Sequence, residues 1–367
     1  MAEARMKAGK WFGVALAAAS VTAGAQVPAT QAPAKQASAA QAGQHTGAAA
    51  ATPAKPLQLQ TLDPATRADP FPAVDQANFT AASPTVETVD SYLHAVMGFD
   101  ANRIWRVLAI QKTTAPGVSR VMAAISERNA GAKVLSAVFY VLPDGKHLIA
   151  SGAQGGNISP FGAAPYAENR ATLQAHADGP ARGSQSKDLM LVEFADLQCP
   201  HCKEAQPTMD RLMSDFPKAR IVFENFPLVQ VHPYAFEAAA YGVCIGNKDK
   251  DAFFKYEKAV FDTQAALVPA TAEATLKAAA TKAGADPAAT AACAATPATK
   301  AAVDAQAKLG ADIGVDQTPM LAVNGRLVPL TVSYETLRNL VTFQASLDGV
   351  SAAAESPNGT GIPEAVK

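Results

Sequence analysis

The run Cys199-Pro200-His201-Cys202 constrains this chain more than any other feature. Two cysteines at this spacing can close a small disulfide ring that opens and closes easily. The apolar run 189–194 before the motif predicts a buried strand. After the motif, apolar residues recur at helical spacing, at Met209, Leu212, Met213 and Phe216. The pattern therefore predicts a strand that leads into two cysteines at the start of a helix.

These residue types suit redox chemistry. The thiolate is the nucleophile in disulfide exchange, and a free cysteine with a pKa of about 8.5 is little ionised at neutral pH. At a helix N-terminus, unpaired N–H groups and the helix dipole favour an anion at Cys199. Pro200 suits the first turn, and His201 adds a donor beside the sulfur. If the pKa of Cys199 were about 4, reduction at neutral pH would gain about 4 kcal/mol, or on the order of 90 mV.

Other uses of the motif are disfavoured by its surroundings. A zinc site would need two more ligands, and the remaining cysteines, Cys244 and Cys293, do not form a second CxxC. Haem attachment requires a histidine directly after the second cysteine, where this chain has Lys203. A purely structural disulfide is uncommon at this spacing. The redox interpretation is therefore preferred.

Residues from about 187 to 350 resemble the DsbA-type thiol:disulfide oxidoreductases of the bacterial periplasm, which have a thioredoxin-like fold. Besides the CPHC motif, three features carry the resemblance. Glu193 lies six residues before Cys199, where the family has a buried glutamate. Pro207 lies where thioredoxins kink the active-site helix, and Thr318-Pro319 precedes an apolar run where they place a cis-proline.

The resemblance implies roles for these residues. Cys199 is the exposed cysteine that meets the substrate, and Cys202 resolves the exchange. Glu193 helps to move the proton of Cys202, while Thr318 and Pro319 hold the substrate chain. Without the resemblance, Glu193 could equally be a surface carboxylate, and Pro319 could be an ordinary trans proline. The direction is also open, because Thr318 is more usual in isomerase-type relatives whereas the PH dipeptide favours oxidation.

The 367 residues are long enough for two domains. We expect an α/β thioredoxin-like fold with an inserted helical domain at about 232–308, preceded by a small α+β domain. The expected segments are a signal peptide (1–25), an Ala/Pro/Gln-rich tether (26–82), an α+β interaction or dimerisation domain (83–152), a linker (153–186), the catalytic domain (187–350) and a tail (351–367). The α+β domain faintly resembles the dimerisation domain of DsbC and DsbG.

The N-terminus predicts export, because basic residues precede a short apolar stretch that ends in Ala23-Gly24-Ala25. Cleavage after Ala25 would place the protein in the periplasm or outside the cell. Disulfides persist in such compartments, so we expect Cys244 and Cys293 to form a structural disulfide rather than two buried thiols. A loop of this length predicts a stabilisation of about 4 kcal/mol.

We therefore expect an exported thiol:disulfide oxidoreductase that introduces or exchanges disulfides in secreted proteins. The alternatives are a DsbC/DsbG-like isomerase or reductase, and a periplasmic chaperone or metal-binding module without redox turnover. The expected partners are reduced or misoxidised client proteins, a DsbB-like oxidase or DsbD-like reductase in the membrane, and a second copy bound through the N-terminal domain. We expect no cofactor and no metal. A net charge of −1 without a basic patch argues against nucleic-acid binding.

Overall fold

A computed structural model of the protein describes residues 69–129, 131–151 and 158–352. The predicted signal peptide (1–25), most of the predicted tether and most of the predicted tail lie outside these residues. The described chain contains two sheets, one in an N-terminal module and one in the segment that carries the CPHC motif. Helices and strands together confirm the predicted α/β class.

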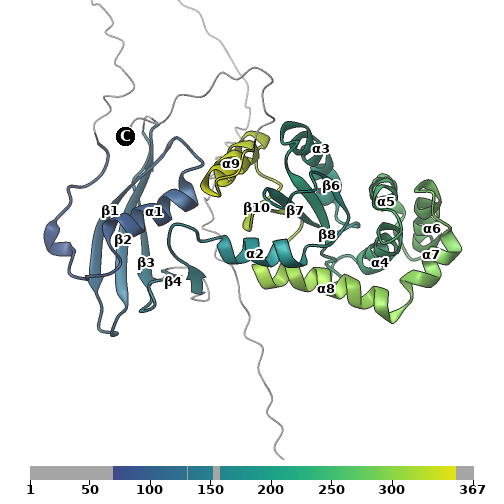
Figure 1. The fold of residues 1–367 in the computed structure, drawn as a ribbon, viewed down its shortest axis with the longest axis horizontal. Helices are drawn as coiled ribbons and strands as arrows, with labels where there is room; N and C mark the ends of the chain where they lie inside the picture. The colour runs from purple at the N-terminus through teal and green to yellow at the C-terminus, as the bar shows by residue number, and fades with distance from the viewer. Residues whose placement is uncertain (1–68, 130, 152–157, 353–367) are drawn as a thin grey trace, which may run out of the picture. The chain divides into compact units, whose positions relative to one another are not determined.

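The N-terminal module is an antiparallel meander in the order β1-β2-β3-β4-β5. Its strands are β1 (Arg103–Lys112), β2 (Ser119–Glu127), β3 (Leu135–Val141), β4 (His147–Ala150) and β5 (Ile158–Pro160). Helix α1 (Val86–Met97) begins after Thr85, whose side chain accepts a hydrogen bond from the Thr88 N–H and caps the helix. Figure 1 shows α1 lying across this sheet, and Val89 and Leu93 of α1 share an apolar cluster with Phe139.

The structure extends this module beyond the predicted limits of 83–152. A short 3-10 helix, η2 (Gln76–Asn78), lies in the predicted tether, and Phe79 forms a bridge with Ile110 of β1. The predicted linker contains β5, which pairs with β4, as well as α2 (Ala167–His176) and β6 (Ala181–Gly183). Strands of three residues are too short to show a hydrophobic period, so the sequence pattern did not reveal β5 or β6.

The second sheet has the order β10-β9-β7-β8-β6. Its other strands are β7 (Met190–Ala195), β8 (Arg220–Asn225), β9 (Met320–Val323) and β10 (Arg326–Pro329). β7 and β8 are parallel, whereas β9 runs antiparallel to β7. Every residue of the central strand β7 is buried, which explains its nearly continuous apolar sequence.

Helices cover both faces of the second sheet (Figure 1). Helices α3 (Pro200–Asp215) and α9 (Tyr334–Leu347) pack on one face, where Met209 and Leu340 share a cluster with Leu191 of β7. Helices α2 and α8 (Pro297–Ile313) cover the other face, where Leu173 and Leu309 meet alternate strand residues. Because side chains alternate along a strand, β7 contributes to both clusters.

A helical segment separates β8 from β9, as predicted. It comprises α4 (Ala235–Gly246), α5 (Lys250–Asp262), η3 (Gln264–Ala266), α6 (Ala272–Lys282), α7 (Pro287–Ala294) and α8. Cys244 of α4 and Cys293 of α7 form a disulfide with an S–S distance of 2.02 Å. The apolar cluster of this segment also includes Cys199 and Cys202, so the inserted helices pack against the CPHC motif.

Candidate active site

The CPHC motif lies where the central strand β7 gives way to helix α3. Cys199 is the N-cap residue, with extended backbone angles, and Pro200 is the first helical residue. Proline is favoured there because its fixed φ suits the first turn and no N–H is needed from it. Cys199 and Cys202 are free thiols. The sequence prediction that Cys199 is exposed is wrong, because inserted helices pack against it and only 4% of the residue is accessible.

The two thiols have opposite electrostatic properties. The pKa of Cys199 is lowered to about 5, chiefly because its thiolate accepts a hydrogen bond from the Cys202 side chain. Thr318 and the backbone N–H groups of Cys202 and His201 also lower it, while burial opposes them. The pKa of Cys202 is raised well above its ordinary value, first by burial and then by Cys199. At neutral pH one thiolate and one thiol therefore stand side by side.

His201 lies on the solvent side of the motif. Its ring atom Nδ1 lies 2.9 Å from Oε2 of Glu204, and about two thirds of its side chain is exposed. The pKa of His201 is raised, first by the hydrogen bond and charge of Glu204 and to a lesser extent by the Cys199 thiolate. A protonated imidazole can therefore persist beside the sulfur at a higher pH than in an isolated histidine.

The Thr318–Pro319 segment forms the opposite wall of the site. The peptide bond between these residues is cis, and the segment leads into β9, the neighbour of β7. The Sγ atom of Cys199 lies 3.8 Å from the carbonyl oxygen of Thr318. The Thr318 hydroxyl is buried and has no hydrogen-bond partner among the described residues, and the Thr318 side chain lowers the pKa of both cysteines.

Glu193 lies on β7 and is buried, with 2% of the residue accessible. One side-chain amide joins it to the motif, because Nε2 of Gln206 donates to Oε1 of Glu193 at 2.9 Å and to the carbonyl oxygen of Cys202 at 3.2 Å. Burial raises the pKa of Glu193 to about 7, although the bond from Gln206 opposes this shift. The carboxyl group can therefore exchange a proton near neutral pH.

Two functional residues were missed or misjudged from the sequence. Asp196 directly follows β7 and is buried, and its backbone N–H donates to the Cys202 sulfur at 3.4 Å. Its Oδ2 atom lies 2.8 Å from Nδ1 of His232 and accepts a hydrogen bond from the Leu228 N–H. A polar residue directly after an apolar strand was the available signal. Gln264 donates to the carbonyl oxygens of Leu197 and Cys199 from η3, and no local sequence signal marked it.

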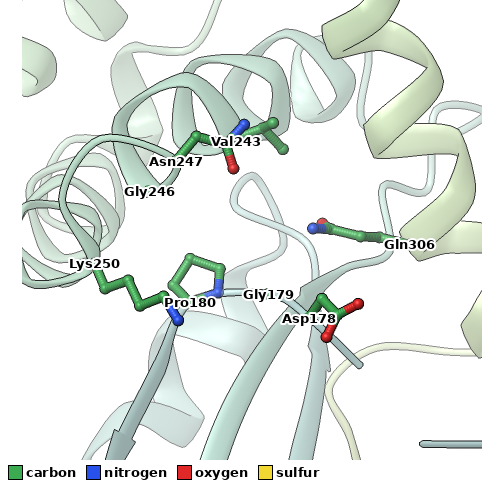
Figure 2. Close-up of a pocket in the computed structure, with 8 residues that line it drawn as sticks. All are labelled: Asp178, Gly179, Pro180, Val243, Gly246, Asn247, Lys250 and Gln306. Carbon is green, nitrogen blue, oxygen red and sulfur yellow. The ribbon is translucent and has the colours of Figure 1, made fainter. Parts of the chain in front are cut away.

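A separate cavity of about 140 Å³ lies between the second sheet and the inserted helices. Figure 2 shows Asp178 and Gln306 beside it, with the Lys250 side chain near Pro180. The lining contains neither cysteine of the motif. We therefore assign it no part in thiol chemistry.

The predicted site residues fall into two groups. The first group surrounds the end of β7 and comprises Cys199, Pro200, His201, Cys202, Thr318, Pro319 and Glu193. The second group, Cys244 and Cys293, forms the disulfide within the inserted helices. Across residues 69–352, outside the gaps in the described chain, no group of three His, Cys, Asp or Glu side chains could hold a metal ion. In the same described segments, no helix is both long and apolar enough to cross a bilayer.

Residues 176–342 match the thioredoxin family model. The curated relatives include a Na⁺/H⁺ antiporter NhaA 1 of Salinispora arenicola, 32% identical over 162 residues, which are 44% of this chain and 24% of that protein. An antiporter NhaA 3 of Salinispora tropica is 41% identical over 58 residues, 16% of this chain and 9% of that protein. The matches thus span a quarter or less of these relatives, and the transport in their names is a property of those proteins.

Solved structures show similarity at low identity. A thioredoxin-like oxidoreductase from Silicibacter pomeroyi is 22% identical, with 48% of this chain and 98% of that chain covered and a TM-score of 0.42. ScsC of Proteus mirabilis in a transitional conformation is 21% identical, with coverages of 51% and 79% and a TM-score of 0.42. BdbD from Bacillus subtilis is 19% identical, with coverages of 47% and 94% and the same TM-score.

Proposed function

We propose that this chain, whose residues 176–342 form a thioredoxin-like domain, is a thiol:disulfide oxidoreductase that works through Cys199 and Cys202. One observation carries the proposal. The first cysteine has a pKa of about 5 at a helix N-terminus, beside a second cysteine whose pKa is raised and opposite a cis-proline segment. A structural pair of thiols needs no such difference, whereas exchange needs one stable thiolate and one resolving thiol.

The proposed reaction begins with Cys199 and Cys202 joined in a disulfide. A client thiolate attacks Sγ of Cys199, a bond forms between these sulfurs, and the Cys199–Cys202 bond breaks. Cys202 leaves with the electron pair and takes up a proton, for which Glu193 is the proposed donor. A second client thiolate then attacks the client sulfur of the mixed disulfide. Cys199 leaves as a thiolate, the client holds a new disulfide, and the protein has gained two electrons.

The low pKa of Cys199 favours the oxidising direction. Stabilising the thiolate stabilises the reduced protein, so the disulfide form becomes a stronger oxidant. A pKa of about 5 stabilises the reduced state at neutral pH by about 3 kcal/mol, or on the order of 60 mV. This contribution is complete above the ordinary cysteine pKa of about 8.5, decreases progressively as pH falls below that value, and is lost as pH falls through about 5.

The Thr318–Pro319 segment is the proposed support for the client chain. Proline has no N–H, so it cannot complete a ladder with a neighbouring strand. The Thr318 carbonyl lies beside Cys199, which supports the proposal that an extended client segment binds next to the reacting sulfur. The proposed clients are reduced or misoxidised exported proteins. A membrane oxidase or reductase would reset the cysteines, and the N-terminal module is the proposed surface for a second copy.

Replacing Cys202 with serine should trap clients on Cys199. The serine cannot release the mixed disulfide, whereas Cys199 keeps its place at the helix N-terminus. The purified variant is incubated with a small protein that contains a disulfide bond. It should accumulate a mixed disulfide between Cys199 and one molecule of this probe, which the intact mass reveals. The Cys199→Ser variant is the matched control and should form none. Equal adducts on both variants, or none on either, would contradict the assignment of Cys199 as the attacking sulfur.

Replacing His201 with serine should raise the pKa of Cys199 and make the reduction potential more negative. The imidazole lies near the thiolate, and Glu204 keeps it protonated to a higher pH. Thiolate absorbance against pH measures the first effect, and equilibration with glutathione measures the second. His176→Ser on the exposed end of α2 is a matched control. Unchanged values in His201→Ser would remove His201 from the mechanism.

An isomerase is the second candidate, favoured by Thr318 before the cis-proline and by the N-terminal module that precedes the redox domain. An isomerase must remain reduced in its compartment. A potential lower than that of an oxidase makes the dithiol easier to oxidise and its disulfide a weaker oxidant of clients, which suits a protein that a partner keeps reduced. The reduction potential therefore separates the two candidates. Export of the chain likewise remains a proposal, based on the basic and apolar residues within 1–25.

A further inference from the structure

A second buried acid, Glu257, interacts electrostatically with Glu193, and the mechanism above does not use it. We propose that Glu257 acts with Glu193 as one carboxyl pair that takes up and returns the proton of Cys202. The inference rests on the proposed function and extends its proton step. Neither acid contacts the client, and either acid of the pair can take up the proton when it is the ionised member.

The position of Glu257 is unusual for an acid. It lies on α5 directly after Tyr256, and Phe253 and Val260 lie about one helical turn before and after it. The side chains of these three residues are fully buried. Only 3% of the residue is accessible. Its Oε1 atom has no hydrogen-bond partner among the described residues. Burying an unpaired carboxyl group destabilises a fold, and apolar packing would serve α5 at this position, so the acid calls for a functional explanation.

Glu257 and Glu193 interact electrostatically although they come from different elements. The charge of Glu193, on β7, raises the pKa of Glu257, on α5, in addition to the larger effect of burial. Two buried carboxyl groups that interact electrostatically do not readily both ionise, because the first charge opposes the second in a medium of low polarity. Near neutral pH the pair therefore holds either one proton or two.

Two further charged groups face both acids. Arg182 of β6 lowers the pKa of Glu193 and of Glu257, whereas Asp210 of α3 raises both. Arg182 and Asp210 form an ion pair with a 3.3 Å N–O distance, and the guanidinium group of Arg182 lies 4.9 Å from the ring centroid of Phe254 on α5. The Asp210 side chain is 64% exposed. Because Asp210 neutralises Arg182, the ion pair adds no net positive charge that would hold both acids ionised. The exposed Asp210 side chain connects this group of charges to solvent.

Gln206 links the pair to the resolving cysteine. Its Nε2 atom donates both to Glu193 and to the carbonyl oxygen of Cys202. When Cys202 attacks the mixed disulfide, its sulfur bonds to Sγ of Cys199 and the bond between Cys199 and the client breaks. The client leaves as a thiolate with the electron pair, and the Cys202 proton moves to the ionised member of the pair. The reverse reaction returns this proton to Cys202.

The test measures how the attack by Cys202 depends on pH. Rapid mixing of the reduced protein with oxidised glutathione forms a mixed disulfide at Cys199, and a second phase reports the release of glutathione by Cys202. The rate of this second phase is measured between about pH 5 and pH 9 for the wild type, Glu193→Gln, Glu257→Gln and the double variant. This range spans the pH at which an acid with a pKa near neutral gains or loses its proton. Glutamine matches the shape of the protonated acid and cannot take up the proton.

We expect the wild-type rate to rise with pH as the pair ionises, with an inflection near about 7 from Glu193. Each single variant keeps one acid, so it should keep one inflection and lose less than about tenfold in rate at neutral pH. The double variant should show no inflection and lose about 100-fold. A Glu193→Gln profile as flat as that of the double variant would overturn the pair.

Two controls separate the possible failures. If the wild-type protein releases no glutathione at any pH, the proposed function fails, and the role of Glu257 fails with it. If the wild type reacts but the double variant keeps the wild-type inflection, only the carboxyl pair is refuted. Denaturant unfolding of all four proteins tests folding, and Asp210→Asn, which keeps both buried acids, should retain an inflection shifted to lower pH because Asp210 raises both pKa values.

Discussion

Replacing Cys199 with serine should reduce the turnover of an insulin-reduction assay to the uncatalysed rate. The expected loss is large because a hydroxyl group does not ionise at neutral pH and cannot form the mixed disulfide. The Cys199 thiolate, by contrast, is favoured by hydrogen bonds from the Cys202 side chain and from two backbone N–H groups. Without this sulfur, Cys202 is left as a buried thiol whose pKa is raised.

The outcome must be separated from misfolding. Serine fits an N-cap position well, so the start of α3 should be retained. Circular dichroism and the denaturant midpoint should therefore match those of the wild type, and His176→Ser provides a variant of an exposed position with full activity. Insulin reduction by a folded Cys199→Ser protein would show that another group performs the exchange.

Replacing Cys244 and Cys293 together with serine should lower the free energy of unfolding by about 4 kcal/mol. The disulfide joins α4 to α7 across 49 positions of the chain, so its loss frees a long loop in the unfolded state. Both sulfurs lie within 3.6 Å of the Thr299 hydroxyl, which can accept or donate a hydrogen bond to the serines. The measured loss should therefore reflect the missing cross-link more than unsatisfied polar groups.

Urea unfolding at equilibrium measures this prediction. The Cys199→Ser/Cys202→Ser variant is the matched control, because it also removes two cysteines but leaves the long loop closed. Its midpoint should stay near that of wild-type protein in which Cys199 and Cys202 are thiols and the Cys244–Cys293 disulfide is intact. An equal midpoint in the Cys244→Ser/Cys293→Ser variant would mean that the helices of the insertion are held by packing alone.

The sequence was most informative where one strand, one motif and one helix follow each other directly. The apolar run before Cys199 and the helical spacing after Cys202 predicted β7 and α3 because burial dictates both patterns. The resemblance then supplied the partners that are distant in sequence, such as Thr318, which lies beside Cys199 in the structure. No local pattern in the chain joins those two positions.

The remaining features depend on tertiary packing. Cys199 is covered by helices that follow it in the chain, so its low exposure could not be predicted from the motif. Asp196 has the sequence character of a solvated loop residue, yet His232 and the Leu228 N–H bind its carboxylate. Glu257 lies in an ordinary amphipathic helix, and only the packing of α5 reveals that the acid is on the buried face.

Cys199 and Cys202 are proposed to form an oxidising couple with a stable Cys199 thiolate. The most direct test is the equilibrium reduction potential against glutathione, together with the pKa of Cys199 from thiolate absorbance. We predict a pKa of about 5 and a potential nearer to about −120 mV than to about −270 mV. A potential near about −270 mV with a pKa of about 7 would contradict the claim and favour a reductase or an isomerase kept reduced by a partner.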